Sequence, residues 1–293
     1  MLLSGEQELL LRAEELVRRR ATTDRRMGSA WMLVPLLPMV IAIVLVAAFV
    51  NAIVPLVPDV GNLSGSEAFS SVAVVLVGIY LAALLSAFAV LFLLSIAIYY
   101  LIDRRNSHFK RQQLLFRAFA KHSGTRGTSS APGLPSLEEL CEDAEFEEQN
   151  RPAGIWAILN LFLGPVVSLT VGFTLTQDLC KHDARQRILL QNLASTFTAA
   201  GTPLPTLDES KPLKRDPILF LLLTIITAGF FWIYWFYTLL KDYNEHFTHQ
   251  AIVEDRIIQA LKPMVPTLNC KGCGGSVPQG AKFCPFCGVA QTT

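Results

Sequence analysis

The sequence has little charge and contains no recognisable catalytic motif. Of its 293 residues only 17% are charged, whereas 52% are hydrophobic, which is too apolar for an ordinary soluble domain. It contains no glycine-rich phosphate loop, no nucleophile elbow and no His-Glu-x-x-His, so we expect no enzymatic activity. The long apolar runs also lack carboxylates, and this counts against an ion-coupled pump, because such pumps place ionisable groups inside their spans.

Basic residues are missing from one connector, and their absence there predicts the topology. The net charge is only +1, so no general electrostatic attraction to nucleic acid is expected. Residues 58–70 hold Asp59 and Glu67 but no Lys or Arg, whereas six arginines precede residue 31. Cytoplasmic loops carry the excess of Lys and Arg. The N-terminus is therefore predicted to lie in the cytoplasm and 58–70 outside.

Four apolar runs are long enough to enter a bilayer, and two of them look alike. Residues 31–57 and 71–102 predict a transmembrane hairpin. The later runs, 152–176 and 217–240, each place a glycine twelve residues after their first proline. They predict one helical unit used twice. The polar residues that recur after the apolar runs are Asp178, His182 and Gln186, then Asp242, His246 and Gln250, with a weaker echo in His108 and Gln112.

Two topologies remain open for the repeated runs. If each run crosses the bilayer once, residues 177–216 lie outside with six of the 25 Lys and Arg. If each run breaks near Gly164-Pro165 or Ala228-Gly229 and returns, all 25 stay inside. We favour this re-entrant arrangement on the charge distribution; a kinked full span is the alternative. Broken helices at membrane depth need protein or water to satisfy the freed backbone groups.

Four of the six cysteines form two C-x2-C motifs near the C-terminus. Cys270 and Cys273 are followed, after ten residues, by Cys284 and Cys287. This spacing predicts a tetrahedral Zn²⁺ site, with iron in a rubredoxin-like site as the alternative, for which the intervening segment is short. Because all four ligands come from the protein, the ion would be structural. The two remaining cysteines, Cys141 and Cys180, are expected to be inert thiols.

The tail resembles the short zinc-ribbon modules, with a Cys-Pro-x-Cys-Gly knuckle, that bacteria and archaea attach to many membrane and regulatory proteins. The resemblance covers Asn269 to about Ala290 and implies binding to protein or nucleic acid. Lys271 and Lys282 are the only cations in that stretch. We therefore expect a protein partner and no nucleic acid.

The run from Leu223 to Trp235 is similar to a family of uncharacterised prokaryotic membrane domains with a Thr-x-Gly, Tyr-Trp signature, often found beside a zinc ribbon. The resemblance implies a multi-pass protein of the prokaryotic inner membrane, with its zinc ribbon in the cytoplasm. The first repeated run has Gly-Pro and lacks Tyr-Trp. Only the inference about the fold extends to that copy.

Three of the helices predicted outside the apolar runs lie before the first repeated run. Residues 5–20 form an amphipathic helix that should lie on the inner membrane surface. The basic helix 103–121 is either held to anionic lipid or is the cytosolic end of the second span. Ser136 and Glu139 predict a capping box that opens an acidic helix. The acidic residues of that helix either face solvent, or they pair with the basic helix or with a partner protein.

Two further groups of residues allow two interpretations each. Asp242, His246 and His249 share one helical face, so they are either a second metal site or interfacial caps and hydrogen bonds. The aromatic cluster after residue 231 is either a bilayer belt, which is commoner, or a ligand surface. Its members are Trp232, Tyr234, Trp235 and Tyr237.

Together these patterns predict an all-α membrane protein with a small C-terminal zinc ribbon. We expect an adaptor or accessory subunit, without enzymatic activity, that contacts lipid through its helices and a protein partner through the ribbon. The alternative is a small transporter or channel built from the two broken repeats. Its oligomeric state stays open. The predicted segments are 1–30, a cytosolic helix; 31–122, a transmembrane hairpin with a basic extension; 123–150, a linker and acidic helix; 151–200, repeat unit 1; 201–216, a linker; 217–262, repeat unit 2; and 263–293, the zinc ribbon.

Overall fold

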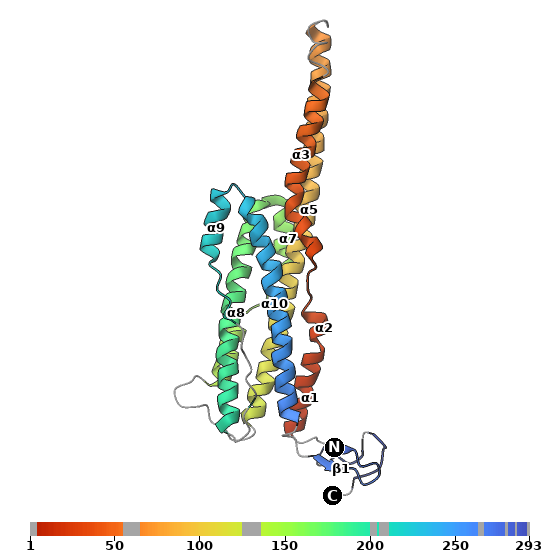
Figure 1. The fold of residues 1–293 in the computed structure, drawn as a ribbon, viewed down its shortest axis with the longest axis vertical. Helices are drawn as coiled ribbons and strands as arrows, with labels where there is room; N and C mark the ends of the chain where they lie inside the picture. The colour runs from red at the N-terminus through yellow and green to blue at the C-terminus, as the bar shows by residue number, and fades with distance from the viewer. Residues whose placement is uncertain are drawn as a thin grey trace.

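The computed structural model shows a mostly helical protein whose helices run along one long axis (Figure 1). It describes residues 5–54, 65–124, 136–199, 204, 211–262, 267–278, 281–284 and 286–291. Most of the predicted outside connector and of both linkers lies outside these residues. The elements are α1 (Gly5–Arg18), α2 (Arg20–Thr23), the 3-10 helix η1 (Ser29–Met32), α3 (Leu33–Ile53), α5 (Gly65–Gly124), α6 (Leu137–Glu147), α7 (Ala153–Leu163), α8 (Pro165–Ala199), α9 (Pro217–Ile226), α10 (Phe230–Leu261), β1 (Thr267–Asn269) and β2 (Ser276–Pro278).

Helix α3 and the first half of α5 form an apolar hairpin that extends well beyond the rest of the protein (Figure 1). By length and composition, Ser29–Ile53 and Val72–His122 can each cross a membrane. Their apolar side chains remain exposed, with Ile43 at 63% and Leu85 at 73%. Exposed apolar surface on this scale is typical of a lipid or protein contact.

Helices α7 and α8, and likewise α9 and α10, form pairs in which the chain doubles back (Figure 1). Two ion pairs join residues that are 27 positions apart: Arg151 with Asp178, and Arg215 with Asp242. A continuous helix would separate such residues by about 40 Å. The pairs form because the chain reverses near the middle of each run. At Gly164 the backbone has φ 43°, a conformation that favours glycine over residues with a side chain.

Two hydrophobic clusters hold α5, α8 and α10 together. The one nearer the apolar hairpin contains Ile98, Leu175, Trp235 and Phe236, and all four are at most 1% exposed. The other, near the far end of the body, contains buried residues of α1, α5, α6, α8 and α10, including Phe119 at 1%. Between the two clusters along each helix lies a stretch of buried polar side chains.

The N-terminal helix is not free to lie on a membrane, which corrects the prediction for residues 5–20. Ala13, Leu16 and Val17 are buried in the second cluster, against α5 and α10. Arg20 donates to the Ala251 carbonyl and to Asp255 at 2.9 Å each. The amphipathic stripe of α1 packs against protein because a complementary apolar face is available within the same chain.

The basic stretch 103–121 continues the second apolar run without a break, because α5 is a single helix of 60 residues. The interpretation of this stretch as lipid-bound is wrong for three of its arginines. Arg104, Arg105 and Arg111 are 1–2% exposed and lie inside the body. A buried guanidinium needs partners, and neighbouring segments supply carbonyls and carboxylates.

The acidic helix α6 begins with the capping box predicted from Ser136 and Glu139. The Glu139 N–H donates to Ser136 Oγ at 3.1 Å, and the Ser136 N–H donates to Glu139 Oε2 at 2.8 Å. The helix pairs with the basic part of α5, since Arg117 forms an ion pair with Glu145. Of the alternatives for this helix, pairing with the basic helix is the one observed.

Substituting Gly172 tests the close packing of α8 against α10. A Cβ atom added at Gly172 would lie 2.7 Å from the Trp232 ring, whereas one added at Gly154 meets nothing within 4 Å. Overpacking costs about 1–3 kcal/mol, which exceeds the gain of at most about 1 kcal/mol from replacing a helical glycine. We expect Gly172→Ala to lower the thermal unfolding midpoint in detergent and Gly154→Ala to leave it unchanged or raised. Equal midpoints for both variants would contradict the packing described.

Candidate metal centre

The four predicted metal ligands lie together at the C-terminal end of the chain. One sulfur atom from each of Cys270, Cys273, Cys284 and Cys287 lies within 4.8 Å of the others. Two of the separations are 3.5 Å, between Cys270 and Cys287, and 3.7 Å, between Cys273 and Cys284. A tetrahedral zinc ion with Zn–S bonds of about 2.3 Å separates its sulfur atoms by about 3.8 Å. The cluster can therefore bind a metal ion such as zinc.

The two knuckles that present these sulfur atoms have the same backbone geometry. In the first, the Gly274 N–H donates to the Cys270 carbonyl at 2.9 Å, and in the second the Gly288 N–H donates to the Cys284 carbonyl at 2.9 Å. The two glycines have φ values of 70° and 73°. This shared turn explains why two C-x2-C motifs can direct four thiols at one point. The antiparallel pair β1–β2 joins the segments on either side of the first knuckle.

Backbone donors also prepare the cluster for a cation. The Gly272 N–H lies 3.3 Å from Cys270 Sγ, and the Phe286 N–H lies 3.4 Å from Cys284 Sγ. The backbone N–H groups of Cys273 and Gly272 lower the pKa of the Cys270 thiol, while the neighbouring thiols raise the pKa of Cys287. Because the thiolate is the form that binds metal, these donors favour the state that a zinc ion requires.

A second group of residues meets in the centre of the helical body, and we call it the polar layer. It contains a histidine and, one turn later, a glutamine from each of α5, α8 and α10. No member is more than 9% exposed. One ring nitrogen from each histidine lies within 4.8 Å of the other two. The members are His108, Gln112, His182, Gln186, His246 and Gln250.

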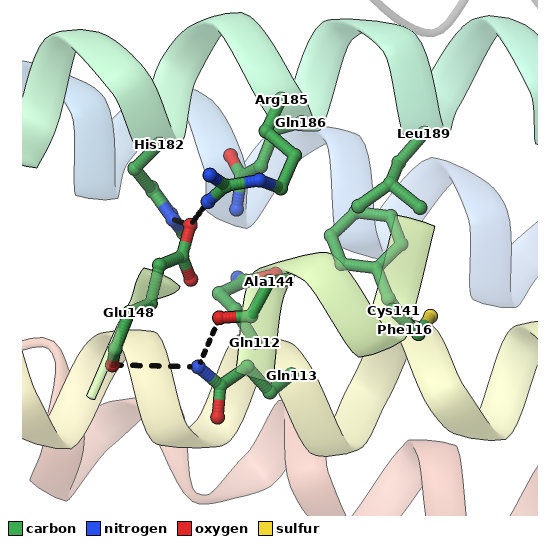
Figure 2. Close-up of a pocket in the computed structure, with 10 residues that line it drawn as sticks. All are labelled: Gln112, Gln113, Phe116, Cys141, Ala144, Glu148, His182, Arg185, Gln186 and Leu189. Atoms are coloured by element: carbon green, nitrogen blue, oxygen red, sulfur yellow. Dashed lines mark hydrogen bonds and ion pairs between the residues drawn. The ribbon is translucent and has the colours of Figure 1, made fainter. Parts of the chain in front are cut away.

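Each histidine of the polar layer faces a carboxylate through Nδ1. The nitrogen lies 3.1 Å from Asp24 in His108, 2.9 Å from Glu148 in His182 and 3.6 Å from Asp183 in His246. Figure 2 shows His182 and Arg185 both directed at the Glu148 carboxylate. Burial lowers the pKa of His108 to about 3, against the opposing effect of Asp24, and burial also lowers the pKa of His246. These two rings are therefore neutral at pH 7.

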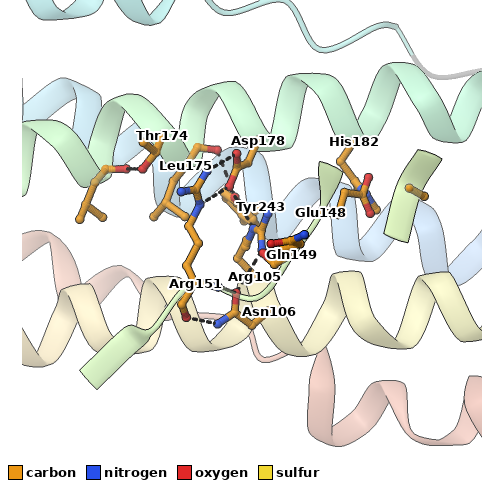
Figure 3. Close-up of polar contacts among 12 residues, drawn as sticks. Arg105, Asn106, Glu148, Gln149, Arg151, Thr174, Leu175, Asp178, His182 and Tyr243 are labelled. Atoms are coloured by element: carbon orange, nitrogen blue, oxygen red, sulfur yellow. Dashed lines mark hydrogen bonds and ion pairs between the residues drawn. The ribbon is translucent and has the colours of Figure 1, made fainter. Parts of the chain in front are cut away.

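Next to the polar layer, on the side of the apolar hairpin, an arginine network closes the α7–α8 pair (Figure 3). Arg151 donates to both oxygens of Asp178, at 2.7 and 2.8 Å, and Arg105 lies 3.0 Å from the same carboxylate. The Tyr243 hydroxyl donates to the Leu175 carbonyl at 3.1 Å. The corresponding pair in α9–α10 is Arg215 on Asp242, with distances of 2.8 and 2.9 Å.

The interpretation of Asp242, His246 and His249 as one metal site is therefore wrong in its membership, and for Asp242 the alternative, hydrogen bonding, is observed. Asp242 is held by Arg215, and His246 turns towards His108 and His182 on other helices. His249 lines a surface cavity with His246 but is not part of the histidine cluster. Residues that share a face of α10 do not all contact the same partners, because α5, α8 and α10 converge at the level of His246.

The sequence did contain a signal for the polar layer. The pattern His-x3-Gln occurs at His108, His182 and His246. In the sequence this pattern indicates repetition, but spacing along the chain does not show that the residues meet. The carboxylate partners had no such signal, since Asp24 comes from the N-terminal arm and Glu148 from the end of α6.

The aromatic cluster of α10 is only partly on the surface. Trp235 is fully buried and its indole N–H donates to Thr176 Oγ1 at 2.9 Å. Tyr234 and Tyr237 are 47% and 42% exposed and remain candidates for a bilayer belt.

The two lone thiols have raised pKa values, which is consistent with the expected lack of reactivity. Burial raises the pKa of Cys141 to about 11 and also raises the pKa of Cys180.

Cobalt substitution tests the cysteine cluster. Thiolate-bound Co²⁺ gives an intense sulfur-to-metal charge-transfer band, so the wild-type chain loaded with cobalt should show one. We expect Cys273→Ser to abolish or strongly weaken this band, because it removes one of four sulfur ligands. Cys141→Ser, a matched substitution of a buried thiol in α6, should leave the spectrum unchanged. An unchanged spectrum for Cys273→Ser would remove Cys273 from the ligand set.

Comparison of the chain with known protein families, curated proteins and solved structures gives no match. The expected resemblance to a prokaryotic membrane-domain family thus gains no support from these comparisons. The structure shows a mostly helical protein with a C-terminal four-cysteine cluster that is consistent with a zinc-binding site. No family is identified for the protein.

Proposed function

We propose that the chain is a membrane-anchored adaptor whose zinc-bound cysteine module, Thr267 to Gln291, contacts a protein partner. The observation that carries this proposal is the exposed apolar surface of the module. Among its described residues, Cys270, Val277 and Cys284 are buried and form a minimal core. Its larger apolar side chains face outwards instead. They are Leu268, Phe283, Phe286 and Val289, with exposed fractions of 50%, 63%, 73% and 43%.

Exposed aromatic side chains on so small a module favour a protein partner. Aromatic residues that become buried at an interface supply much of the binding energy. Figure 1 shows the module at the end of the helical body opposite the tip of the apolar hairpin. If the hairpin is in the bilayer, this arrangement places the module well clear of the lipid headgroups, where a cytosolic protein can reach it.

The membrane part of the proposal rests on the exposed α3–α5 hairpin and on the two doubled-back helix pairs. The turns of those pairs carry exposed apolar side chains, including Phe162 at 79% and Ile226 at 76%. The Arg-Asp pairs lie at the opposite ends of the short helices α7 and α9, away from these turns. Such units are suited to dipping into the cytoplasmic side of a bilayer and returning. We infer that they are two copies of one re-entrant unit.

Partner capture tests the adaptor. The paired substitution Phe283→Ser and Phe286→Ser should leave cobalt binding at the cysteines intact and weaken partner binding, by about 30-fold if the two rings are hot spots worth about 2 kcal/mol together. Phe146→Ser is the matched control, because Phe146 is 77% exposed on α6, away from the module. A stoichiometric protein copurified with wild type and with Phe146→Ser, but lost from the double variant, supports the proposal.

Retention of that protein by the double variant would refute a contact through the module. Solute flux in proteoliposomes, unaffected by deletion of residues 267–293, would favour the transporter or channel that the repeated units also suggest. The two assays separate the two functions, because the adaptor needs the module and the transporter does not.

Cysteine labelling tests the topology. In spheroplasts, a membrane-impermeant maleimide should label Ser64→Cys, in the connector predicted to lie outside, and should spare Lys211→Cys, which lies in an exposed segment before α9. Permeabilised membranes should label both. Labelling of Lys211→Cys in intact spheroplasts would place residues 177–216 outside and exclude the re-entrant arrangement.

A further inference from the structure

We propose that His108, His182 and His246 bind a divalent transition-metal ion, with zinc as the first candidate, in the core of the helical body. The site is distinct from the cysteine cluster and is independent of the adaptor proposal. Each ligand comes from a different long helix: α5, α8 and α10. A metal ion here would join the three helices that form the centre of the body.

The three rings are close enough to share one ion. One ring nitrogen from each lies within 4.8 Å of the others. The ring centroids are 5.2–5.4 Å apart, and each pair of rings is steeply inclined, at 67–80°. A tetrahedral ion with metal–nitrogen bonds of about 2.1 Å separates its nitrogen ligands by about 3.4 Å. Small side-chain rotations therefore suffice to complete the coordination.

The groups around the rings favour Nε2 as the ligand atom. Nδ1 of His182 is hydrogen-bonded to Glu148, whereas Nδ1 of His108 faces Asp24 without hydrogen-bond geometry and Nδ1 of His246 lies 3.6 Å from Asp183. Nδ1 of each ring faces a carboxylate, which favours the tautomer with the proton on Nδ1 and the lone pair on Nε2. Among the residues that the structure describes, no group hydrogen-bonds to Nε2 of any of the three histidines, although all three atoms are buried. A buried polar atom without a partner costs about 1–3 kcal/mol. One metal ion would satisfy all three lone pairs.

The carboxylates behind the histidines are themselves held in place. Arg111 Nη2 lies 2.7 Å from Asp24 and Arg187 Nε lies 3.0 Å from Asp183, while Arg185 pairs with Glu148. Each histidine therefore belongs to a chain that runs from arginine to carboxylate to imidazole. Metal-binding histidines almost always donate their second N–H in this way, since it fixes the ring and increases its basicity. Three such chains that converge on one point are more than a hydrophobic core requires.

The ligand set indicates which ions fit. Three imidazoles suit zinc, copper, nickel or iron, whereas magnesium and calcium prefer oxygen ligands. Three protein ligands leave a fourth tetrahedral position for water or a small anion.

A surface cavity of about 250 Å³ reaches His246 and is lined by Asp183, Asp242, Glu245 and His249, among others. Its carboxylates would attract a cation towards the site.

Metal analysis of the full chain, purified in detergent and equilibrated with zinc, tests the site. Wild type should hold two zinc ions per chain, one at the cysteines and one at the histidines. His182→Ala should hold one and retain the cobalt–thiolate band, which shows that the missing ion is not the one at the cysteines. His249→Ala is the matched control, because it removes a neighbouring histidine outside the cluster, and it should hold two. Replacement of all four metal-ligand cysteines by serine should leave one ion.

A milder variant covers the case in which His182→Ala fails to fold. Glu148→Gln keeps every proposed ligand and should raise the zinc dissociation constant of the histidine site about 10–100-fold, as expected for loss of an orienting carboxylate. The helical circular dichroism should be unchanged. No zinc ion in the variant without the four cysteines, or one ion in that variant that persists after His182→Ala, would overturn the proposal. The first result would leave a metal-free, hydrogen-bonded histidine cluster.

Discussion

The packing of the helical body depends on the pairing of charged and polar groups that have been removed from water. A buried guanidinium or carboxylate is costly unless a partner of opposite charge and enough hydrogen bonds surround it. Arg111 satisfies this requirement with Glu254 on α10 and with Asp24 from the N-terminal arm. Sliding α5 by one residue against α10 would separate these groups and leave charges unpaired. These buried charge pairs therefore set the register in which the two apolar clusters can form.

Local patterns in the sequence were enough to predict the helices and the cysteine cluster. The C-x2-C spacing determines the knuckle turns within a few residues, so Cys270 and Cys273 could be assigned without knowing the rest of the fold. The capping box at Ser136 is likewise a local signal, and the structure contains it. The glycine at residue 164 predicted a break, and the chain does reverse there.

The positions of the buried arginines and the membership of the polar layer could not be predicted in this way. Arg104, Arg105 and Arg111 look like a cytosolic surface in sequence, because composition does not show that three other segments cover them. Asp24 and His108 lie 84 positions apart along the chain, and their contact depends on how α1, α2 and α5 pack together. The same limit applies to the apolar stripe of the N-terminal helix, since an apolar face fits a bilayer and a helical bundle equally well.

The continuity of α5 has a mechanical consequence. This helix contains no proline, the commonest cause of a sharp kink, and it runs without interruption from the apolar hairpin to the level of His108. Tyr80 and His108 are separated by about 42 Å along its axis. If this part of the helix moves as a rigid rod, a tilt of about 5° about Tyr80 displaces His108 by about 4 Å. This displacement is comparable to the distances between the histidine nitrogens. Thinning or thickening of the surrounding lipid would then alter the geometry of a cluster that lies far from it.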